Sequence, residues 1–278
     1  MEIRLAKSYG FCFGVKRAIK IAEENPRSIT FGPLIHNKKE IERLKQSYNV
    51  GLVEDIDEVK NGDRVVIRTH GIPKQKLQIL QEKDVEVIDA TCPFVTKPQQ
   101  IVQQMSEEGY SIVIFGDANH PEIKGVMSYA VDEPVVVMSV EELQHRLHEL
   151  KEKVATVAQT TRKFSEYAKI VNFLMEHKKE VRVFNTICNA TFENQDAARE
   201  LAKEADVMIV IGGKNSSNTK QLLNICKESC PDSYLVEDES ELKKEWFEGK
   251  KLCGVTAGAS TPDWIIQKVI GKIKEIKV

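Results

Sequence analysis

Three of the six cysteines in the sequence stand where a β-like run gives way to a helical segment. They are Cys12 after residues 3–5, Cys92 after residues 85–88 and Cys188 after residues 181–184. The N-terminus of a helix stabilises a thiolate, which is the form of cysteine that binds a metal. A structural zinc site usually takes four ligands from close cysteine pairs, so three thiolates from distant segments fit it poorly. They suit a [4Fe–4S] cluster with one open iron, although the chain has no compact cysteine motif and the spacing leaves the metal undecided.

The other three cysteines have the surroundings of core residues. Cys226 and Cys230 are four residues apart on a helical segment or at its end, and Cys253 lies inside the β-like run 252–256. We expect all three to be small buried hydrophobic side chains. An even cysteine count would suggest disulfides in a small secreted chain, but metal or redox chemistry is the better interpretation for a cytosolic chain of this size.

Hydrogen-bonding residues follow the remaining strand-like runs at similar distances from the three cysteines. The loops that end these runs carry His36 and His70, His120 and Thr160, and Ser216 and Ser260. The first of each pair follows the preceding cysteine by 24, 28 and 28 residues, and the second follows the first by 34, 40 and 44 residues. This self-similarity indicates three related modules. Ligands of open α/β sheets bind at the carboxyl ends of strands, so nine such ends would bring the cysteines and loops to one central site.

Two helices can be read from the spacing of apolar residues. Val15 opens a pattern, continued at residues 18, 19 and 22, that is typical of an amphipathic helix. Another helix is predicted to begin at Ser139, with Glu142 in a capping-box position, and to continue through Leu143, Leu147, Leu150 and Val154.

The alternation of elements predicts the fold class. Short β-like runs, such as 65–67, 112–114 and 207–211, alternate with helical segments, which favours an α/β fold with mostly parallel sheets. We expect three small modules related by a pseudo-threefold axis around a central cluster and substrate cavity. The modules would span residues 13–92, 93–188 and 189–278, and the N-terminal strand within residues 1–12 would complete the third.

Composition excludes several classes of protein. The chain has 278 residues, with 40 Lys and Arg against 42 Asp and Glu, and a formal net charge of −2. This balance argues against a nucleic-acid-binding protein, and a hydrophobic share of 41% is that of a globular chain with a sizeable core. The N-terminus lacks the apolar region of a signal peptide, and no apolar run approaches the roughly 18 residues of a membrane span, so we expect a cytoplasmic protein without a membrane partner.

Seven motifs in sequence carry a resemblance that covers essentially the whole chain. They are residues 10–15 (GFCFGV), 89–97 (DATCPFVTK), 120–122 (HPE), 159–161 (QTT), 186–191 (TICNAT), 214–218 (KNSSN) and 254–260 (GVTAGAS). Together they resemble the 4-hydroxy-3-methylbut-2-enyl diphosphate reductase family, whose members act last in the non-mevalonate isoprenoid pathway. One departure is visible, because Asn194 and Gln195 stand where the family usually has an Arg-Gln pair.

The resemblance implies a reaction and a set of catalytic residues. The family removes an allylic hydroxyl with two electrons and two protons, and gives isopentenyl and dimethylallyl diphosphates. The resemblance places a [4Fe–4S] cluster on Cys12, Cys92 and Cys188, with the open iron binding the substrate hydroxyl. It assigns the proton donor to Glu122, near His120 and Thr160, and a glutamic acid in a closed apolar site can stay protonated because burial raises its pKa.

The resemblance also implies how the diphosphate is bound. The expected diphosphate contacts come from imidazole, hydroxyl and amide groups of several loops: His36, His70, His120, Thr160, Thr161, Ser216, Ser217, Asn218 and Ser260. The other three histidines, His145, His148 and His177, are expected to be solvated. The basic residues Lys38, Lys39, Lys97, Arg162 and Lys163 would be ordinary surface or a docking rim for an acidic one-electron donor of the ferredoxin or flavodoxin type.

Two other functions stay open at the level of the sequence. A hydro-lyase with an open iron would use the same cluster without an external reductant. A non-enzymatic redox or phosphate sensor would bind the cluster and the anion without turnover. Turnover of a hydroxylated allylic diphosphate with a one-electron donor separates the three functions.

Overall fold

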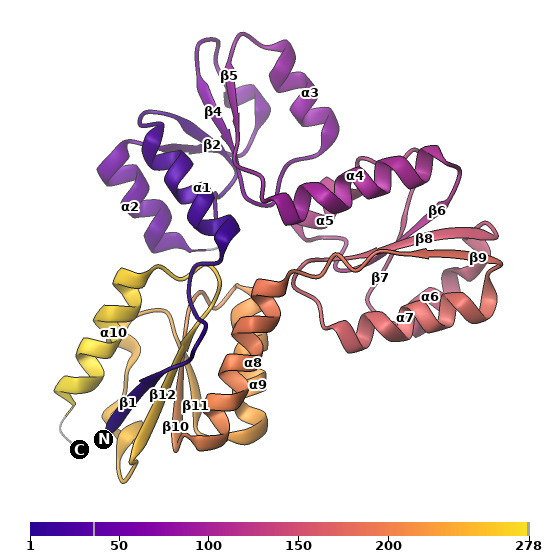
Figure 1. The fold of residues 1–278 in the computed structure, drawn as a ribbon. Helices are drawn as coiled ribbons and strands as arrows, with labels where there is room; N and C mark the ends of the chain where they lie inside the picture. The colour runs from indigo at the N-terminus through magenta and orange to yellow at the C-terminus, as the bar shows by residue number, and fades with distance from the viewer. Residues whose placement is uncertain (36, 277–278) are drawn as a thin grey trace. The chain divides into compact units, whose positions relative to one another are not determined.

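The computed structural model describes residues 1–35 and 37–276, which fold as an α/β protein with three parallel sheets (Figure 1). The strands are β1 (Glu2–Leu5), β2 (Ile29–Phe31), β3 (Gly51–Val53), β4 (Arg64–Ile67), β5 (Glu86–Asp89), β6 (Ser111–Phe115), β7 (Val135–Val137), β8 (Lys153–Ala158), β9 (Glu180–Val183), β10 (Val207–Ile211), β11 (Ser233–Val236) and β12 (Leu252–Ala257). The α-helices are α1 (Phe13–Glu24), α2 (Lys38–Tyr48), α3 (Lys74–Glu82), α4 (Pro93–Glu107), α5 (Pro121–Met127), α6 (Val140–Arg146), α7 (Phe164–His177), α8 (Asn189–Glu204), α9 (Ser217–Ser229) and α10 (Asp263–Glu275). Short 3-10 helices are η1 (Ile56–Glu58), η2 (Leu147–Glu149), η3 (Glu239–Glu241) and η4 (Lys244–Phe247).

All three sheets have four strands in the same internal order. Read from the edge strand that precedes a cysteine, the orders are β1-β12-β10-β11, β5-β4-β2-β3 and β9-β8-β6-β7, and we name each sheet by its first strand. Every strand pair in them is parallel. In the β1 sheet, Glu2 lies opposite Leu252, so the N-terminal strand completes a sheet built from the C-terminal part of the chain. The α/β fold with parallel sheets is confirmed.

The nine strands expected before the cysteines and hydrogen-bonding loops are present, and the described residues contain three more. The additional strands are β3, β7 and β11, which form the edge of each sheet opposite the cysteine-bearing strand. β3 and β7 have only three residues each, and β11 is a mixed polar and apolar segment of four. Such short edge strands leave no periodicity for a sequence pattern to detect.

Two helix predictions had different outcomes. The helix that contains Val15 is confirmed as α1. The capping residue Ser139 is also confirmed, since its Oγ accepts from the Glu142 amide at 3.3 Å, but α6 ends at Arg146. Extension of the helix to Val154 was wrong, because Val154 lies fully buried on β8, where β-branched residues pair with β6.

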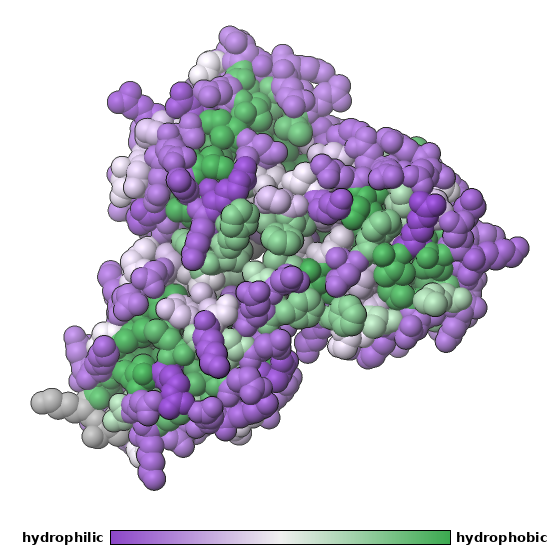
Figure 2. Space-filling view, in the orientation of Figure 1, coloured by the Kyte–Doolittle hydropathy of each residue, from purple (hydrophilic) through white to green (hydrophobic). Residues whose placement is uncertain are grey.

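The central strands are buried on both faces by helices. In the β1 sheet, Val207, Ile209 and Ile211 of β10 pack against α10, while Met208 and Val210 pack against α8 and α9. Strands covered on both faces read as continuous apolar runs, which explains why β10 was visible in the sequence. In the β9 sheet, α4 and α5 pack against β6, and in the β5 sheet α3 packs against β2 and β4. Figure 2 shows hydrophilic residues over much of the periphery of the visible face.

The chain divides into two compact units. The first contains Met1–Ile19, Ile35–Tyr48 and the described residues from Asn189 onward, and therefore holds the β1 sheet. The second contains Lys20–Leu34 and Asn49–Cys188, and holds the β5 and β9 sheets. The three-module boundaries at residues 92/93 and 188/189 stay a prediction. Among the described helices, none combines the length and apolar character needed to cross a bilayer.

Candidate active site

The three candidate cysteine ligands occupy the same position in the three sheets. Cys12 immediately precedes α1, Cys92 is the residue that caps α4, and Cys188 immediately precedes α8. Each follows the edge strand of its sheet, and each is partly exposed. A thiol at the first turn of a helix lies where the helix dipole favours its ionised form.

The backbone around these cysteines repeats as well. The amides of Cys12, Cys92 and Cys188 donate to the carbonyls of Ala259, Thr69 and Thr160 at 3.2, 3.0 and 2.9 Å. Each acceptor lies two residues beyond the end of the neighbouring strand, which is β12, β4 or β8. The residue after each acceptor is Ser260, His70 or Thr161, so every cysteine is held beside a loop that carries a candidate diphosphate contact.

The other cysteines have a different environment. Cys226, Cys230 and Cys253 are buried, as predicted. Burial raises the pKa of the Cys226 and Cys253 thiols to about 12, with a smaller contribution from neighbouring Cys230. They therefore stay protonated at neutral pH, and a metal would have to displace that proton in a closed apolar site.

The donor set fits an iron–sulfur cluster on chemical grounds. Three partly exposed thiols at helix N-termini are suited to bind a soft metal as thiolates. Cys12 belongs to the first compact unit, and Cys92 and Cys188 belong to the second. Within the part of the chain that the structure describes, no three His, Cys, Asp or Glu side chains are gathered around a point that could hold a metal ion. Assignment of the cluster to these cysteines is therefore a proposal, which is taken up below.

The candidate proton donor is enclosed by protein. Glu122 lies in the first turn of α5, and its side chain is only 1% exposed. Thr160, after β8, holds both carboxyl oxygens: its amide donates to Oε1 at 2.8 Å and its Oγ1 donates to Oε2 at 2.7 Å. The carbonyl of the same residue accepts from the Cys188 amide at 2.9 Å. Thr160 thus joins the candidate acid to the backbone of a candidate ligand within one unit.

Burial sets the protonation of Glu122. Desolvation raises the pKa of this carboxyl above its ordinary value, and the two bonds from Thr160 and the charge of Arg162 oppose the shift without cancelling it. An acid with a raised pKa keeps its proton closer to neutral pH, which general acid catalysis requires. Burial also lowers the pKa of Arg162, and Asp117 and Glu122 counteract that effect.

Two histidines stand beside this acid. His120 caps α5, and its Nδ1 accepts from the Glu122 amide at 3.2 Å. In the neutral ring the proton is then on Nε2, which can serve as a donor. The His70 ring packs edge-on against the His120 ring, with centroids 5.5 Å apart. In the second unit, Glu122 is therefore linked to Thr160 through its carboxyl and to His120 through its amide, and His120 packs against His70.

The first unit holds a separate group of predicted binding residues. Ser216 is buried and caps α9 by accepting from the Thr219 amide at 3.3 Å. Asn218 is 7% exposed, and neither its Oδ1 nor its Nδ2 has a hydrogen-bond partner in the described part of the chain. A buried amide without partners costs free energy, so Asn218 is a candidate for binding a polar ligand.

Two glycines make room around α9. A Cβ at Gly258 would lie 2.4 Å from Thr219 Oγ1, and one at Gly212 would lie 2.8 Å from the same atom. Gly212 also has φ of +153°, which L side chains rarely adopt. These glycines allow the loops after β10 and β12 to lie close to the start of α9.

The remaining predicted site residues have mixed surroundings. Ser260 is buried, Thr161 is partly buried, Ser217 is exposed, and His36 lies outside the described residues. His145, His148 and His177 are exposed, as predicted. Of the basic residues, Lys38, Lys97 and Lys163 are exposed, Lys39 pairs with Asp238, and Arg162 donates to Gln159 at 3.2 Å.

Two contacts were missed by the reading of the sequence. Gln159 is buried, and its Oε1 accepts from the amide of Asp117 at 3.0 Å, so it joins the loops that carry Glu122 and Thr160. Its signals in the sequence were the QTT motif at residues 159–161 and its place directly after the apolar strand β8. Asn194 stands where an arginine is usual in the resembled family, and it accepts from Ser8 Oγ at 2.6 Å.

Comparisons with known proteins agree along the whole chain. The family described as LytB protein matches residues 3–274. The chain belongs to the LytB family. It is 80% identical over 278 residues to 4-hydroxy-3-methylbut-2-enyl diphosphate reductase from a Nitratiruptor species, with both chains fully covered. The reductase of the same name from Nautilia profundicola is 67% identical over 278 residues, which cover 99% of this chain and all of that protein.

Two solved structures resemble this LytB chain. A structure of (E)-4-hydroxy-3-methyl-but-2-enyl diphosphate reductase, described as the terminal enzyme of the non-mevalonate pathway, is 45% identical with a TM-score of 0.76 and covers 99% of this chain and 100% of that one. The E-1-hydroxy-2-methyl-but-2-enyl-4-diphosphate reductase from Plasmodium falciparum is 29% identical with a TM-score of 0.87, covering 97% of this chain and 86% of that one.

Proposed function

We propose that this chain reduces (E)-4-hydroxy-3-methylbut-2-enyl diphosphate to isopentenyl diphosphate and dimethylallyl diphosphate. Full-length LytB relatives that bear the reductase name, at 80% and 67% identity, support this function. The observation within the chain that carries it is Thr160, which binds the Glu122 carboxyl and the backbone of Cys188 at once. A proton donor and a thiol ligand are then adjacent, as the reductive loss of a hydroxyl group needs.

Cys12, Cys92 and Cys188 would hold an iron–sulfur cluster of the [4Fe–4S] type. Their partial exposure and their places at helix N-termini support this choice over the three buried thiols. When bound, a cluster with three cysteine ligands supplies electrons and one open iron for the substrate hydroxyl.

The chain's own residues would supply the proton. Loss of the hydroxyl breaks a C–O bond, consumes two electrons and two protons, and releases water. The raised pKa of Glu122 keeps a proton available, and its 2.7 Å contact with Thr160 Oγ1 gives that proton a route toward the substrate oxygen. His120 accepts from the Glu122 amide and packs against His70, and ring N–H groups of these histidines would orient an oxygen of the substrate.

The diphosphate would be bound by neutral and imidazole donors. Asn218, with two unpartnered amide atoms, and the buried hydroxyls of Ser216 and Ser260 support this assignment in the first unit. We assign the same role to His36, His70, His120, Thr160, Thr161 and Ser217 on the strength of the family's motifs.

The electron donor would be a small acidic carrier of the ferredoxin or flavodoxin type. In the second unit, the exposed lysines Lys97 and Lys163 are close in sequence to exposed aromatic residues, since Phe94 is 44% and Phe164 is 50% exposed. Lysine steers an acidic partner, and an exposed ring supplies contact area.

Anaerobic turnover tests the function. The purified protein is analysed for iron and sulfide and then assayed with the allylic diphosphate and reduced methyl viologen. We expect both five-carbon diphosphate products, formed only when the reductant is present. Consumption of the substrate without a reductant would replace the proposal with a hydro-lyase. Binding of substrate by iron-loaded protein without any product would replace it with a sensor.

A further inference from the structure

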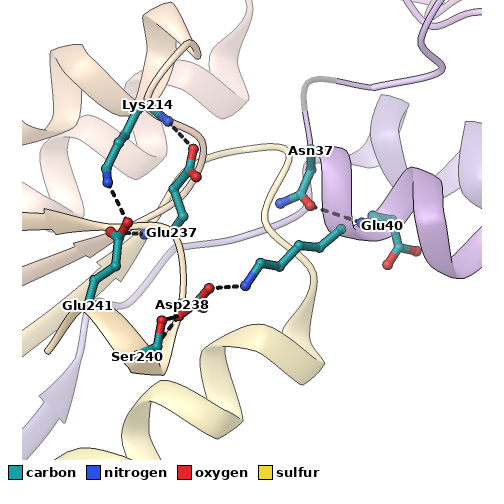
Figure 3. Close-up of polar contacts among 8 residues, drawn as sticks. Asn37, Glu40, Lys214, Glu237, Asp238, Ser240 and Glu241 are labelled. Carbon is teal, nitrogen blue, oxygen red and sulfur yellow. Dashed lines mark hydrogen bonds and ion pairs between the residues drawn. The ribbon is translucent and has the colours of Figure 1, made fainter.

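The segment that follows β11 carries four acidic residues but no residue assigned to substrate or cluster. We call residues 237–241 the acidic turn. It is ordered from within, because Asp238 caps η3 by accepting from the Ser240 amide at 2.7 Å, and Glu241 Oε2 accepts from the Glu237 amide at 3.0 Å (Figure 3). Three of its carboxylates point toward two neighbouring segments of the first unit.

The first of these segments is the loop between β10 and α9. Glu237 Oε1 accepts from the backbone amide of Lys214 at 2.8 Å, and Glu241 Oε1 pairs with the ammonium group of the same lysine (Figure 3). Lys214 is two residues before Ser216, which caps α9 and precedes Asn218. The acidic turn therefore fixes the backbone of the loop that presents the unpartnered Asn218 amide.

The second segment is the start of α2. Lys39 Nζ donates to Asp238 Oδ2. The same end of α2 is capped by Asn37, whose Oδ1 accepts from the Glu40 amide at 3.0 Å (Figure 3). Glu40 is buried and accepts from Trp264 Nε1 of α10 at 2.9 Å. One turn thus contacts both the loop before α9 and the first turn of α2.

Two lysines offset part of the negative charge of the acidic turn. The bond to Glu241 raises the pKa of Lys214. Burial raises the pKa of Glu241, but Lys214, the Glu237 amide and Lys39 outweigh it, and the net direction is down. Lys214 and Glu241 are therefore both charged, and paired, near neutral pH. A single exposed ion pair contributes little, whereas charge-assisted bonds to backbone amides in a connected group fix geometry.

We propose that the acidic turn positions the diphosphate-binding loops, with Glu237 and Glu241 setting the Lys214 loop and Asp238 setting the start of α2. These are positioning residues, because they act through Lys214 and Lys39 and do not touch the substrate. The proposal rests on the proposed function for the identity of the substrate. Binding of inorganic pyrophosphate tests the positioning role without it.

The test uses full-length, cluster-loaded protein. We expect the double variant Glu237→Ala/Glu241→Ala to raise both the KM for the allylic diphosphate and the calorimetric Kd for inorganic pyrophosphate about tenfold. We expect kcat to stay within about twofold and the iron content to be unchanged. Glu237→Gln, which keeps an acceptor for the Lys214 amide, should bind pyrophosphate nearly as wild type does. Glu239→Ala is the matched control, because Glu239 makes no side-chain hydrogen bond or ion pair with the described residues.

A charge exchange tests the contact with α2. Asp238→Lys should weaken pyrophosphate binding, and the combination of Asp238→Lys with Lys39→Asp should restore it. Unchanged pyrophosphate binding in the double alanine variant would overturn the proposal. Equal losses in kcat, binding and thermal stability would reduce the turn to a purely structural role and overturn it as well. Normal binding of pyrophosphate by a wild-type protein that fails to reduce the substrate would refute the proposed function alone.

Discussion

Glu122 is a buried carboxyl group, and both of its oxygens accept hydrogen bonds from Thr160. Glutamine has nearly the same shape, and its oxygen and amide can keep both contacts with Thr160. It cannot deliver a proton of comparable acidity. Substitution of Glu122 by glutamine therefore removes the acidic proton while the hydrogen bonds to Thr160 are kept.

We predict that Glu122→Gln loses roughly 10²–10⁴ in turnover, the usual share of general acid catalysis. Cluster content and pyrophosphate affinity should remain at wild-type levels. Single-turnover reduction, followed together with the iron content, measures the effect. Near-normal turnover in the cluster-loaded variant would assign the proton donor elsewhere.

The same substitution has a consequence for stability that depends on pH. The folded carboxyl has a pKa raised above its ordinary value of 4.5, so the unfolded state releases this proton at lower pH. The unfolded state then binds fewer protons, and the free energy of unfolding falls as pH rises from 4.5 through the folded pKa. We predict that Glu122→Gln gains stability relative to wild type across that window, by at most about 1.4 kcal/mol per pH unit, and equals it at lower pH. Denaturant unfolding of both proteins from acid to neutral pH checks the sign, and a difference that does not vary with pH would contradict it.

At the scale of elements, the start of α9 carries a buried polar side chain whose hydrogen-bonding capacity is not used within the described chain. Asn218 leaves two buried polar atoms without partners in the described chain. We predict that Asn218→Leu does not lower the free energy of unfolding of the unliganded protein, and raises it by up to about 2 kcal/mol. Pyrophosphate binding should be lost, while Asn215→Leu, at an exposed position of the loop before α9, should retain it. Lower stability together with intact binding would show that Asn218 is a structural residue.

The loop after β12 packs closely against Thr219 because residue 258 is glycine. A Cβ at Gly258 would meet the fully buried Thr219 side chain at 2.4 Å. We predict that Gly258→Ala lowers the free energy of unfolding by about 1–3 kcal/mol, the usual cost of overpacking. Gly271→Ala is the control, because no atom lies within 4 Å of that Cβ in α10 and alanine is the better helix former. An equal effect at both positions would refute the role given to the contact with Thr219.

At the scale of the whole molecule, one cysteine precedes each sheet-to-sheet crossing of the chain. We predict that serine at Cys12, Cys92 or Cys188 removes the cluster iron and the activity. Serine at Cys226, Cys230 or Cys253 should retain both, because these thiols are buried in apolar surroundings. Iron analysis and the visible spectrum of anaerobically purified variants measure the outcome. Loss of iron from Cys226→Ser but not from Cys188→Ser would reverse the assignment.

Strands and the residues at their ends could be predicted from the sequence, because both depend on the local pattern of apolar residues. The run from Val207 to Ile211 is buried on both faces, so its strand could be read directly, and the cysteines at strand ends followed from such runs. The error at α6 arose because apolar residues kept a helical spacing across the break before β8. That spacing cannot distinguish one helix from a helix followed by a strand.

Contacts between distant residues could not be predicted in the same way. Glu122 and Thr160 are 38 residues apart, and only the pairing of β6 with β8 brings their loops together. No sequence motif marked the acidic turn. Its contact with α2 depends on Lys39, which is 199 residues from Asp238. The family motifs suggested the roles of single residues such as Glu122. Only the fold shows which residues contact one another.

Because β1 pairs with β12, the β1 sheet cannot be completed until late in synthesis of the chain. Glu2 leaves the ribosome first, but its partner Leu252 is made 250 residues later. At about 5–20 residues per second, β1 and the adjoining Cys12 segment wait roughly 12–50 s for the strand that receives them. The β5 and β9 sheets contain only residues 29–183, so their strands are complete while β12 is still untranslated. Cys12, the first cysteine to be made, therefore reaches its folded position only after nearly the whole chain has been released. Under the proposed ligand assignment, a cluster on all three cysteines would form only after that point.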